Sequence, residues 1–400
     1  MKILVANLGS TSFKYRLYDL GDPSEALLAR GSVERIGSES AKVKIQTEKG
    51  EVEEVLPIPD HGVAVKICLD LLTAPEIGVI QSADDVSAIG FKAVHARNLT
   101  GVVRVNDSVL DAMDVYSGVA PAHNPPYTKA MRTLAQRFPN IPLVAAFETD
   151  FHRTIPEAQQ RYAVPEDWVS QCGVRRYGFH GASHRYIAGR MGELMGRKDA
   201  KIISLHLGGS SSVCAIKEGK SVATSMGMSP QSGLPQNNRV GDFDIFAVPA
   251  VMRELNLSIE QILDTLANHS GLLGLSGAGN DLRDIEAAAD QAQPRAQLAL
   301  DVYIASIRHY LGAYLLELGG ADAIVFTGGI GENSERIRAG VLKDLGWFGI
   351  QIDWEKNASA KGEIQISTPE SRVQVWTVPT NEEIVVARQA RDLLSGAVGS

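Results

Sequence analysis

The sequence predicts an α/β protein with two similar lobes, and two stretches of the chain carry this prediction. Residues 2–6 are a short apolar, β-branched run typical of a buried strand, a turn of small residues follows, and residues 13–18 alternate apolar with polar positions as a returning strand does. The same strand, glycine turn and alternating strand recur over residues 202–217. The copies are separated by roughly half of the chain, which is typical of a duplicated fold. A chance likeness of two serine-glycine hairpins is the alternative.

The two turns suggest a ligand. Gly9 lacks the Cβ that would keep an anion away from backbone N–H groups, and Lys14 adds a cation just beyond the turn. In the second copy, Gly208 and Gly209 are followed by three serines at positions 210–212. A pair of such turns predicts a nucleotide held between the two lobes.

Composition restricts the classes of protein. A chain of 400 residues allows two domains, and a net charge of −8 argues against non-specific binding to nucleic acid or to anionic membranes. The three cysteines are scattered, so we expect free thiols and a cytoplasmic location. The N-terminus shows no basic-then-apolar leader, and the longest apolar helix, expected at 295–318, carries Asp301, Arg308 and Glu317. We therefore expect neither export nor a membrane span.

In the first half, residues 26–57 are expected to form an exposed sheet extension, and residues 61–73 a helix. A strand at 86–94 is followed by a proline-rich loop at 120–126 and a helix at 127–138. The buried strand at 141–147 ends at Glu148, and ligands bind at the carboxyl ends of strands in open α/β sheets. We place a lobe boundary near residue 150.

In the second half, residues 175–184 collect two arginines and two histidines beside glycines, which favours an anion site, and a helix is expected at 183–195. A long loop over 231–244 carries Arg239. The strand at 323–327 runs into a glycine turn at 328–333, with a helix from about 334, so that phosphate or adenosine could meet backbone amides. The last helix should begin with a capping box of Thr380 and Glu383.

These segments together resemble the acetokinases (acetate, propionate and butyrate kinases), in the superfamily of actin, sugar kinases and heat-shock chaperone ATPases. The matching stretches run from Asn7 to Glu382 in the family's order: residues 7–14, 176–181, 268–274, 326–333 and 379–383. The resemblance implies a duplicated actin-like (ribonuclease H-like) two-lobe fold with a nucleotide cleft between the lobes. It implies lobes at 1–150, joined by the C-terminal helix 381–396, and at 151–380, the second binding nucleotide and joining a homodimer.

The implied activity is the reversible, ATP-dependent phosphorylation of a short-chain carboxylate to an acyl phosphate, with Mg²⁺. By position, the resemblance assigns catalysis to His180, Arg239, Lys92 and Glu148, and metal binding to Asn7 and Glu382. It assigns the nucleotide to Ser10, Ser12, Lys14, His206, Leu207, Gly208, Gly209, Ser210, Asp281, Leu282, Arg283, Gly329, Ile330, Gly331, Glu332 and Asn333. It assigns the carboxylate to Lys92, Val94, Ala122, His123, Phe179 and Pro230.

The chemistry agrees with this reading. A carboxylic acid with a pKa near roughly 4 is already ionised at pH 7, so the nucleophile needs no general base. Two anions must instead be neutralised and aligned, which Mg²⁺, His180 and Arg239 can do. A kinase acting on a sugar hydroxyl would need an aspartate base.

Several family positions are changed. Lys92 occupies the position of an arginine in the family, and Glu148 occupies the position of an aspartate. Lysine carries its charge at one point, whereas arginine presents a planar group that can make two parallel hydrogen bonds. We hypothesise that these two changes compensate within one ion-paired unit. Gly209 occupies the position of an asparagine in the family. Ala122 occupies the position of a leucine, and this smaller side chain should open the acyl pocket to acids longer than acetate.

Two other functions stay open. One is a nucleotide-binding regulatory protein of the same fold whose catalysis has decayed at Lys92 and Glu148. The other is a kinase for a different acceptor, such as a sugar or polyol. The physiological acid and the direction of flux are not decided by these residues.

Overall fold

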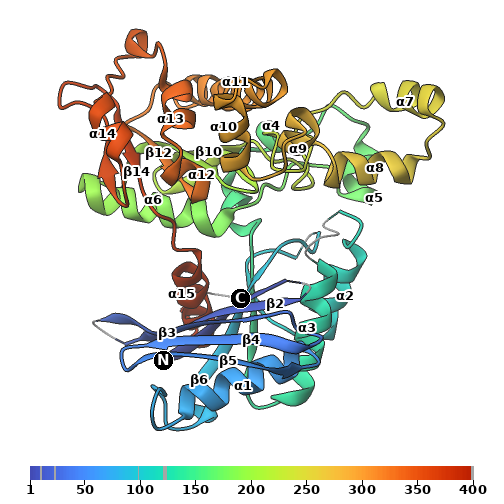
Figure 1. Cartoon of the computed structure of the whole chain (residues 1–400), viewed down its shortest axis with the longest axis vertical. Coiled ribbons are helices and arrows are strands. Elements are labelled where there is room, and N and C mark those ends of the chain that lie inside the picture. The colour runs from blue at the N-terminus through green and yellow to red at the C-terminus, as the bar shows by residue number, and fades with distance from the viewer. Residues whose placement is uncertain (10, 22–23, 98, 120–123, 398–400) are drawn as a thin grey trace. The chain divides into compact units, whose positions relative to one another are not determined.

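The computed structural model describes residues 1–9, 11–21, 24–97, 99–119 and 124–397. It divides into two compact units, Met1–Asp150 with Asn381–Ser400, and Phe151–Thr380 (Figure 1). Each unit is a β-sheet with helices on its faces, which confirms the expected α/β class. The expected site residues Ser10, Ala122 and His123 lie outside the described residues.

The first unit is built on an eight-stranded sheet in the order β5-β4-β3-β2-β1-β6-β8-β7. Its strands are β1 (Lys2–Leu8), β2 (Ser12–Leu20), β3 (Glu25–Glu34), β4 (Ser38–Thr47), β5 (Gly50–Ile58), β6 (Val86–Ala93), β7 (Val102–Arg104) and β8 (Leu143–Phe147). β1 runs antiparallel to β2 and parallel to β6. The antiparallel strands β3 to β5 form the expected sheet extension.

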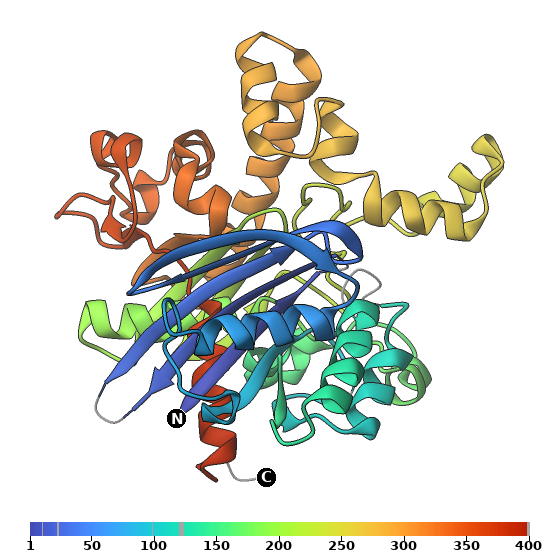
Figure 2. The same cartoon turned by 60° about the horizontal axis from the view of Figure 1, so that its bottom comes forward.

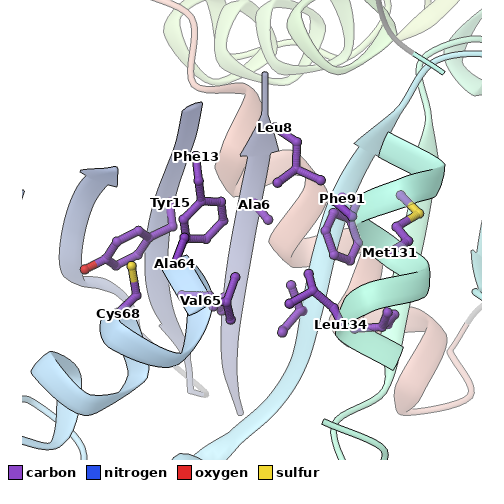
Figure 3. Packing of buried hydrophobic residues seen from close by; sticks show 14 of the residues in the cluster. Ala6, Leu8, Phe13, Tyr15, Ala64, Val65, Cys68, Phe91, Met131 and Leu134 are labelled. Atoms are coloured by element: carbon purple, nitrogen blue, oxygen red, sulfur yellow. The ribbon is translucent and has the colours of Figure 1, made fainter. Parts of the chain in front are cut away.

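Helices cover both faces of this sheet. The helices are α1 (His61–Thr73), α2 (Asp107–Val115), α3 (Asn124–Arg137) and α15 (Glu382–Leu394), with a short 3-10 turn at Ala83–Asp85. Alternate residues of β1 face opposite sides, so Ala6 and Leu8 join the core beneath α1 and α3, where Phe91 and Leu134 also lie (Figure 3). α15 packs on the other face, where a Cβ at Gly90 would lie 3.0 Å from Val386. Packing of α15 on the sheet therefore fixes the position of its first turn within the unit.

The second unit repeats the central strands of the first. Its six-stranded sheet has the order β11-β10-β9-β12-β14-β13. The strands are β9 (Lys201–Leu207), β10 (Ser211–Lys217), β11 (Lys220–Thr224), β12 (Ala323–Thr327), β13 (Ile364–Gln365) and β14 (Gln374–Thr377). β9 runs antiparallel to β10 and parallel to β12, as β1 does with β2 and β6. The repeated sequence pattern thus corresponds to a repeated strand arrangement.

The helices of the second unit enclose two core clusters. The helices are α4 (Glu157–Gln160), α5 (Glu166–Cys172), α6 (Gly181–Met195), α7 (Ala247–Leu255), α8 (Ile259–Asn268), α9 (Gly271–Ser276), α10 (Leu282–Asp290), α11 (Pro294–Glu317), α12 (Gly328–Asn333), α13 (Glu335–Leu342) and α14 (Trp354–Ser359), with 3-10 turns at Asp150–Thr154 and Gly346–Phe348. Tyr303 and Ile307 of α11 pack on one face of the sheet, and Ile187 and Met191 of α6 on the other.

Two local expectations were wrong. The glycine segment 328–333 is itself the helix α12, and Ser334 then caps α13 by accepting a hydrogen bond from the Ile337 N–H. Gly328 has a φ of +77°, and a Cβ there would lie 2.7 Å from the Leu207 carbonyl oxygen, so this position requires glycine. The cap of α15 is Asn381, whose Oδ1 accepts from the Ile384 N–H at 3.2 Å, in place of the expected Thr380. Among the described helices, none is long and apolar enough to cross a membrane.

Candidate active site

A backbone hydrogen bond closes the first glycine turn of the chain. The Gly9 N–H donates to the Ser12 carbonyl oxygen at 2.8 Å, and β1 and β2 pair up to Leu8 and Phe13. His61 Nε2 lies 2.9 Å from the Gly9 carbonyl oxygen, which anchors the turn to α1. Lys14 is exposed on β2 just past the turn.

The side chain of Asn7, on β1, contacts the first turn of α15 at Glu383. Glu383 follows Glu382, the glutamate expected to share a metal ion with Asn7. Asn7 Nδ2 donates to Glu383 Oε1 at 3.1 Å, and Arg16 Nη1 lies 3.5 Å from Glu383 Oε2. Asn7, Lys14 and Glu383 line a pocket of about 310 Å³ together with three further cations, Arg16, Arg30 and Lys44. Sequence reasoning assigned Glu383 to a helix cap and thus missed it as a site residue.

Lys92 lies among carboxylates of the same unit. Its Nζ forms an ion pair with Glu382 at the first turn of α15. Burial lowers the pKa of Lys92, but the negative charges of Glu382 and Glu148 more than offset this and raise the pKa above its ordinary value. Glu148 is buried at the end of β8. The hypothesised unit of Lys92 and Glu148 therefore has a third member, Glu382, which makes the direct contact with Lys92.

In the second unit, four separate segments form one pocket of about 670 Å³. Its lining includes eight residues expected to bind nucleotide, namely Gly208, Gly209, Asp281, Leu282, Arg283, Gly329, Ile330 and Asn333. It also includes Asn237, Glu286 and Ser334, which the sequence reasoning missed. The missed residues belong to no glycine motif, so no local signal marks them.

Two carboxylates of this region have shifted pKa values for different reasons. Asp281 caps α10 through the Arg283 N–H at 2.9 Å, and its hydrogen bonds with the Arg283 guanidinium lower its pKa to about 2. Glu332 lies on α12, where burial raises its pKa. Of the other expected nucleotide residues, Leu207 and Gly331 are buried beneath the pocket-forming turns.

Arg239 is a partly buried cation held by neutral oxygens. Its Nη1 donates to Gln236 Oε1 at 3.1 Å and to Ser210 Oγ at 3.3 Å. Ser210 also donates to Gln236 Oε1 at 2.6 Å, and Gln236 is fully buried. Burial lowers the pKa of Arg239, because no compensating charge outweighs desolvation. A guanidinium in this state gains from binding an anion.

His180 belongs to a cluster of histidines and serines. It stands before α6 with a φ of +56°, and its ring stacks on that of His206 with centroids 4.2 Å apart. Ser212 Oγ lies 2.8 Å from His180 Nδ1 and 2.8 Å from His184 Nε2. Burial lowers the pKa of His184 well below its ordinary value, so this ring is neutral at pH 7. By contrast, Arg176 of the expected anion cluster is engaged by three backbone carbonyls.

The expected acyl-pocket residues are distributed over both units. Val94 is buried just after β6, and Phe179 is buried immediately before His180. Pro230 contributes its carbonyl oxygen to Gln236 Nε2 at 2.7 Å. Gln236 therefore links Arg239, which donates to its Oε1, with the Pro230 carbonyl oxygen, which accepts from its Nε2.

A magnesium ion fits the chemistry of the α15 start. Mg²⁺ binds oxygen ligands and commonly takes one or two carboxylates, with waters and phosphates completing its shell. Asn7, Glu382 and Glu383 supply such oxygens. Among the described residues there is no group of three or more histidine, cysteine, aspartate or glutamate side chains that could hold a metal ion alone.

Comparison with known proteins gives a consistent result over the whole chain. A model of the acetokinase family matches residues 2–388. An acetate kinase of Clostridium botulinum is 44% identical over 398 residues, which cover 98% of this chain and 99% of that protein. Among solved structures, an acetate kinase of Porphyromonas gingivalis is 38% identical with a TM-score of 0.88, covering 98% and 99% of the two chains. A propionate kinase of Francisella tularensis is 31% identical with a TM-score of 0.87, covering 97% and 98%.

Proposed function

We propose, from the premise that this chain belongs to the acetokinase family, that it transfers the terminal phosphoryl group of ATP to a short-chain carboxylate, forming an acyl phosphate and ADP. The observation that carries the proposal is the pocket of about 670 Å³ in the second unit. Its four lining segments bring glycine backbone and the N-terminal end of α10 to one place, as a polyanion requires.

The reaction needs charge neutralisation more than proton transfer. The carboxylate oxygen attacks phosphorus, the bond from phosphorus to the ADP oxygen breaks, and no proton has to leave the nucleophile. Arg239, partly buried and bonded to two neutral oxygens, suits the phosphoryl oxygens. His180 adds a hydrogen-bond donor for the same group, and Lys92, held in its charged form, suits the carboxylate.

Magnesium is part of the proposal. Asn7, Glu382 and Glu383 are the residues that would hold it, through oxygen ligands. The ion supplies positive charge against the phosphates. The protein's contribution is the fixed start of α15, which presents two adjacent carboxylates in one turn.

The acceptor is proposed to include acids longer than acetate. Lysine at position 92 does not impose the two-pronged geometry of arginine, and Ala122 replaces a larger family residue. One methylene in an apolar pocket changes discrimination by about 1–3 kcal/mol. The smaller side chain at position 122 should offset most of this discrimination, so we expect kcat/KM for acetate, propionate and butyrate to agree within about tenfold. A stronger preference for acetate would contradict this.

We also propose a homodimer formed through the second unit. α7 and α8 project from the rest of that unit (Figures 1 and 2), and Ile245, Phe246 and Leu255 there are 62%, 84% and 64% exposed. An apolar surface of this kind gains from a second copy. Phe246→Glu should give monomers in sedimentation velocity, whereas Trp347→Glu, a control at another exposed aromatic residue, should not. Monomeric parent protein would refute the proposal.

The activity is tested by measuring ADP release with a panel of carboxylates and polyols, together with hydroxylamine trapping of any acyl phosphate. We expect ADP and hydroxamate in equal amounts with short-chain carboxylates. ADP release with polyols alone would indicate a different acceptor. The absence of turnover with any acid would favour a decayed, regulatory protein. A cytoplasmic location, expected from the free thiols of Cys68, Cys172 and Cys214, stays a prediction.

A further inference from the structure

Position 209 in the second glycine turn has no side chain, and the structure places the side-chain amide of Asn237 beside it. Gly209 and Asn237 both line the pocket of about 670 Å³. A Cβ added at Gly209 would lie 3.3 Å from Asn237 Nδ2, which is closer than ordinary van der Waals contact allows. The space next to the turn is thus already taken by Asn237.

The main chain of Asn237 is fixed at this place. Its N–H donates to the Gly209 carbonyl oxygen at 3.2 Å, and its own carbonyl accepts from the Leu273 N–H at 2.8 Å. These two bonds attach it both to the glycine turn and to α9. The backbone that carries this side chain is therefore ordered before a ligand binds, which removes the backbone part of the entropic cost of binding.

The side-chain amide is not fully used within the protein. Asn237 Oδ1 is a buried atom that has no hydrogen-bond partner among the described residues. Buried polar atoms are nearly always paired, so this acceptor in the wall of a ligand pocket calls for a donor there, such as a bound water or a ligand hydroxyl. The Nδ2 group next to the glycine turn is a hydrogen-bond donor, as phosphate oxygens require.

We propose that Asn237 binds the nucleotide, with Nδ2 donating to a phosphate oxygen, and that Gly209 is required to leave room for it. This inference rests on the proposed function. The side-chain amide next to the glycine turn comes from position 237. An asparagine at 209 and an asparagine at 237 should therefore exclude one another.

The test is a double-mutant cycle with Gly209→Asn, Asn237→Ala and the double variant. We expect each single change to raise the KM for ATP about tenfold, the scale of a hydrogen bond to a charged group, with little change in the KM for the carboxylate. The double variant should return to within about threefold of the parent, because the new amide replaces the lost one. Additive single effects would overturn the proposal.

Asn238→Ala is the matched control, since it makes the same chemical change one residue away, outside the pocket lining. Its KM for ATP should match that of the parent. Equal effects of Asn237→Ala and Asn238→Ala would also overturn the inference. Calorimetric binding of ATP and thermal unfolding are measured for every variant, so that loss of fold is separated from loss of contact. A parent that binds ATP but forms no acyl phosphate would refute the proposed function while leaving the inference about Asn237 open to the same binding cycle.

Discussion

Replacing Lys92 by methionine should lower the unfolding free energy of the first unit by more than the loss of an exposed ion pair does. The change keeps the length of the side chain but removes the positive charge that pairs with Glu382 and lies near the buried Glu148. Removing one partner of a buried ion pair costs about 3–5 kcal/mol. Because the Lys92 and Glu382 side chains remain 27% and 14% exposed, solvent screens part of this cost, and we expect about 2–3 kcal/mol.

The matched control is Lys66→Met in the same unit. Lys66 pairs with Asp70 at 2.6 Å on α1, and both side chains are more than half exposed. Lysine and methionine have similar helix propensities, so the control should cost only about 0.3–0.5 kcal/mol. Urea unfolding followed by circular dichroism measures both differences.

The pH dependence of the Lys92→Met effect gives a second test. In the parent, the raised pKa of Lys92 means that its stabilisation is fully present below the ordinary lysine pKa and is lost only as pH rises through the higher folded value. In the variant, the cost arises from ionised carboxylates that have lost the nearby Lys92 charge, so the penalty is present at high pH and is relieved as protonation neutralises them at lower pH. The difference in unfolding free energy should therefore shrink from pH 8 to pH 5. A cost equal to that of Lys66→Met, or one independent of pH, would refute the reasoning.

Three further changes have defined outcomes. Gln236→Met should lower kcat/KM about 10- to 100-fold, because Arg239 loses a hydrogen bond that holds its guanidinium in place. The melting temperature should change little, and unchanged kinetics would contradict the prediction. Arg338→Met should lower the melting temperature and raise the KM for ATP, since the buried Arg338 donates to two carbonyls of α12, at residues 331 and 332. Burial lowers the pKa of His152 to about 4, so its contribution to stability is present above about pH 6.5 and is lost toward pH 4; His152→Asn should flatten this acid-side slope by about 1.4 kcal/mol per pH unit in urea titrations.

The sequence predicted the repeated core well because its pattern is local. Strands β1, β2, β9 and β10 follow directly from apolar runs and alternation around glycine turns. α12 was not predictable in this way, since glycine-rich segments are poor helix formers and its place depends on packing of Gly328 against the Leu207 carbonyl. Tertiary contacts decide such segments.

The candidate site likewise contains residues that local motifs predict and residues that only tertiary contacts identify. Glycine segments were visible as motifs, and eight of their residues line one pocket. Gln236 and Asn237 were invisible, because their roles depend on contacts with Ser210 and Gly209, 26 and 28 positions earlier in the chain. Glu382 and Glu383 differ by one position at a helix start, and only the fold shows that Asn7 bonds the second of them.

The central claim, that a carboxylate oxygen attacks the terminal phosphorus of ATP directly, is tested by supplying doubly ¹⁸O-labelled acetate and reading the product by ³¹P nuclear magnetic resonance. The account predicts an acyl phosphate whose phosphorus signal carries the isotope shift of one bonded ¹⁸O. An unshifted phosphorus signal, or ADP formed without any acyl phosphate, would contradict it.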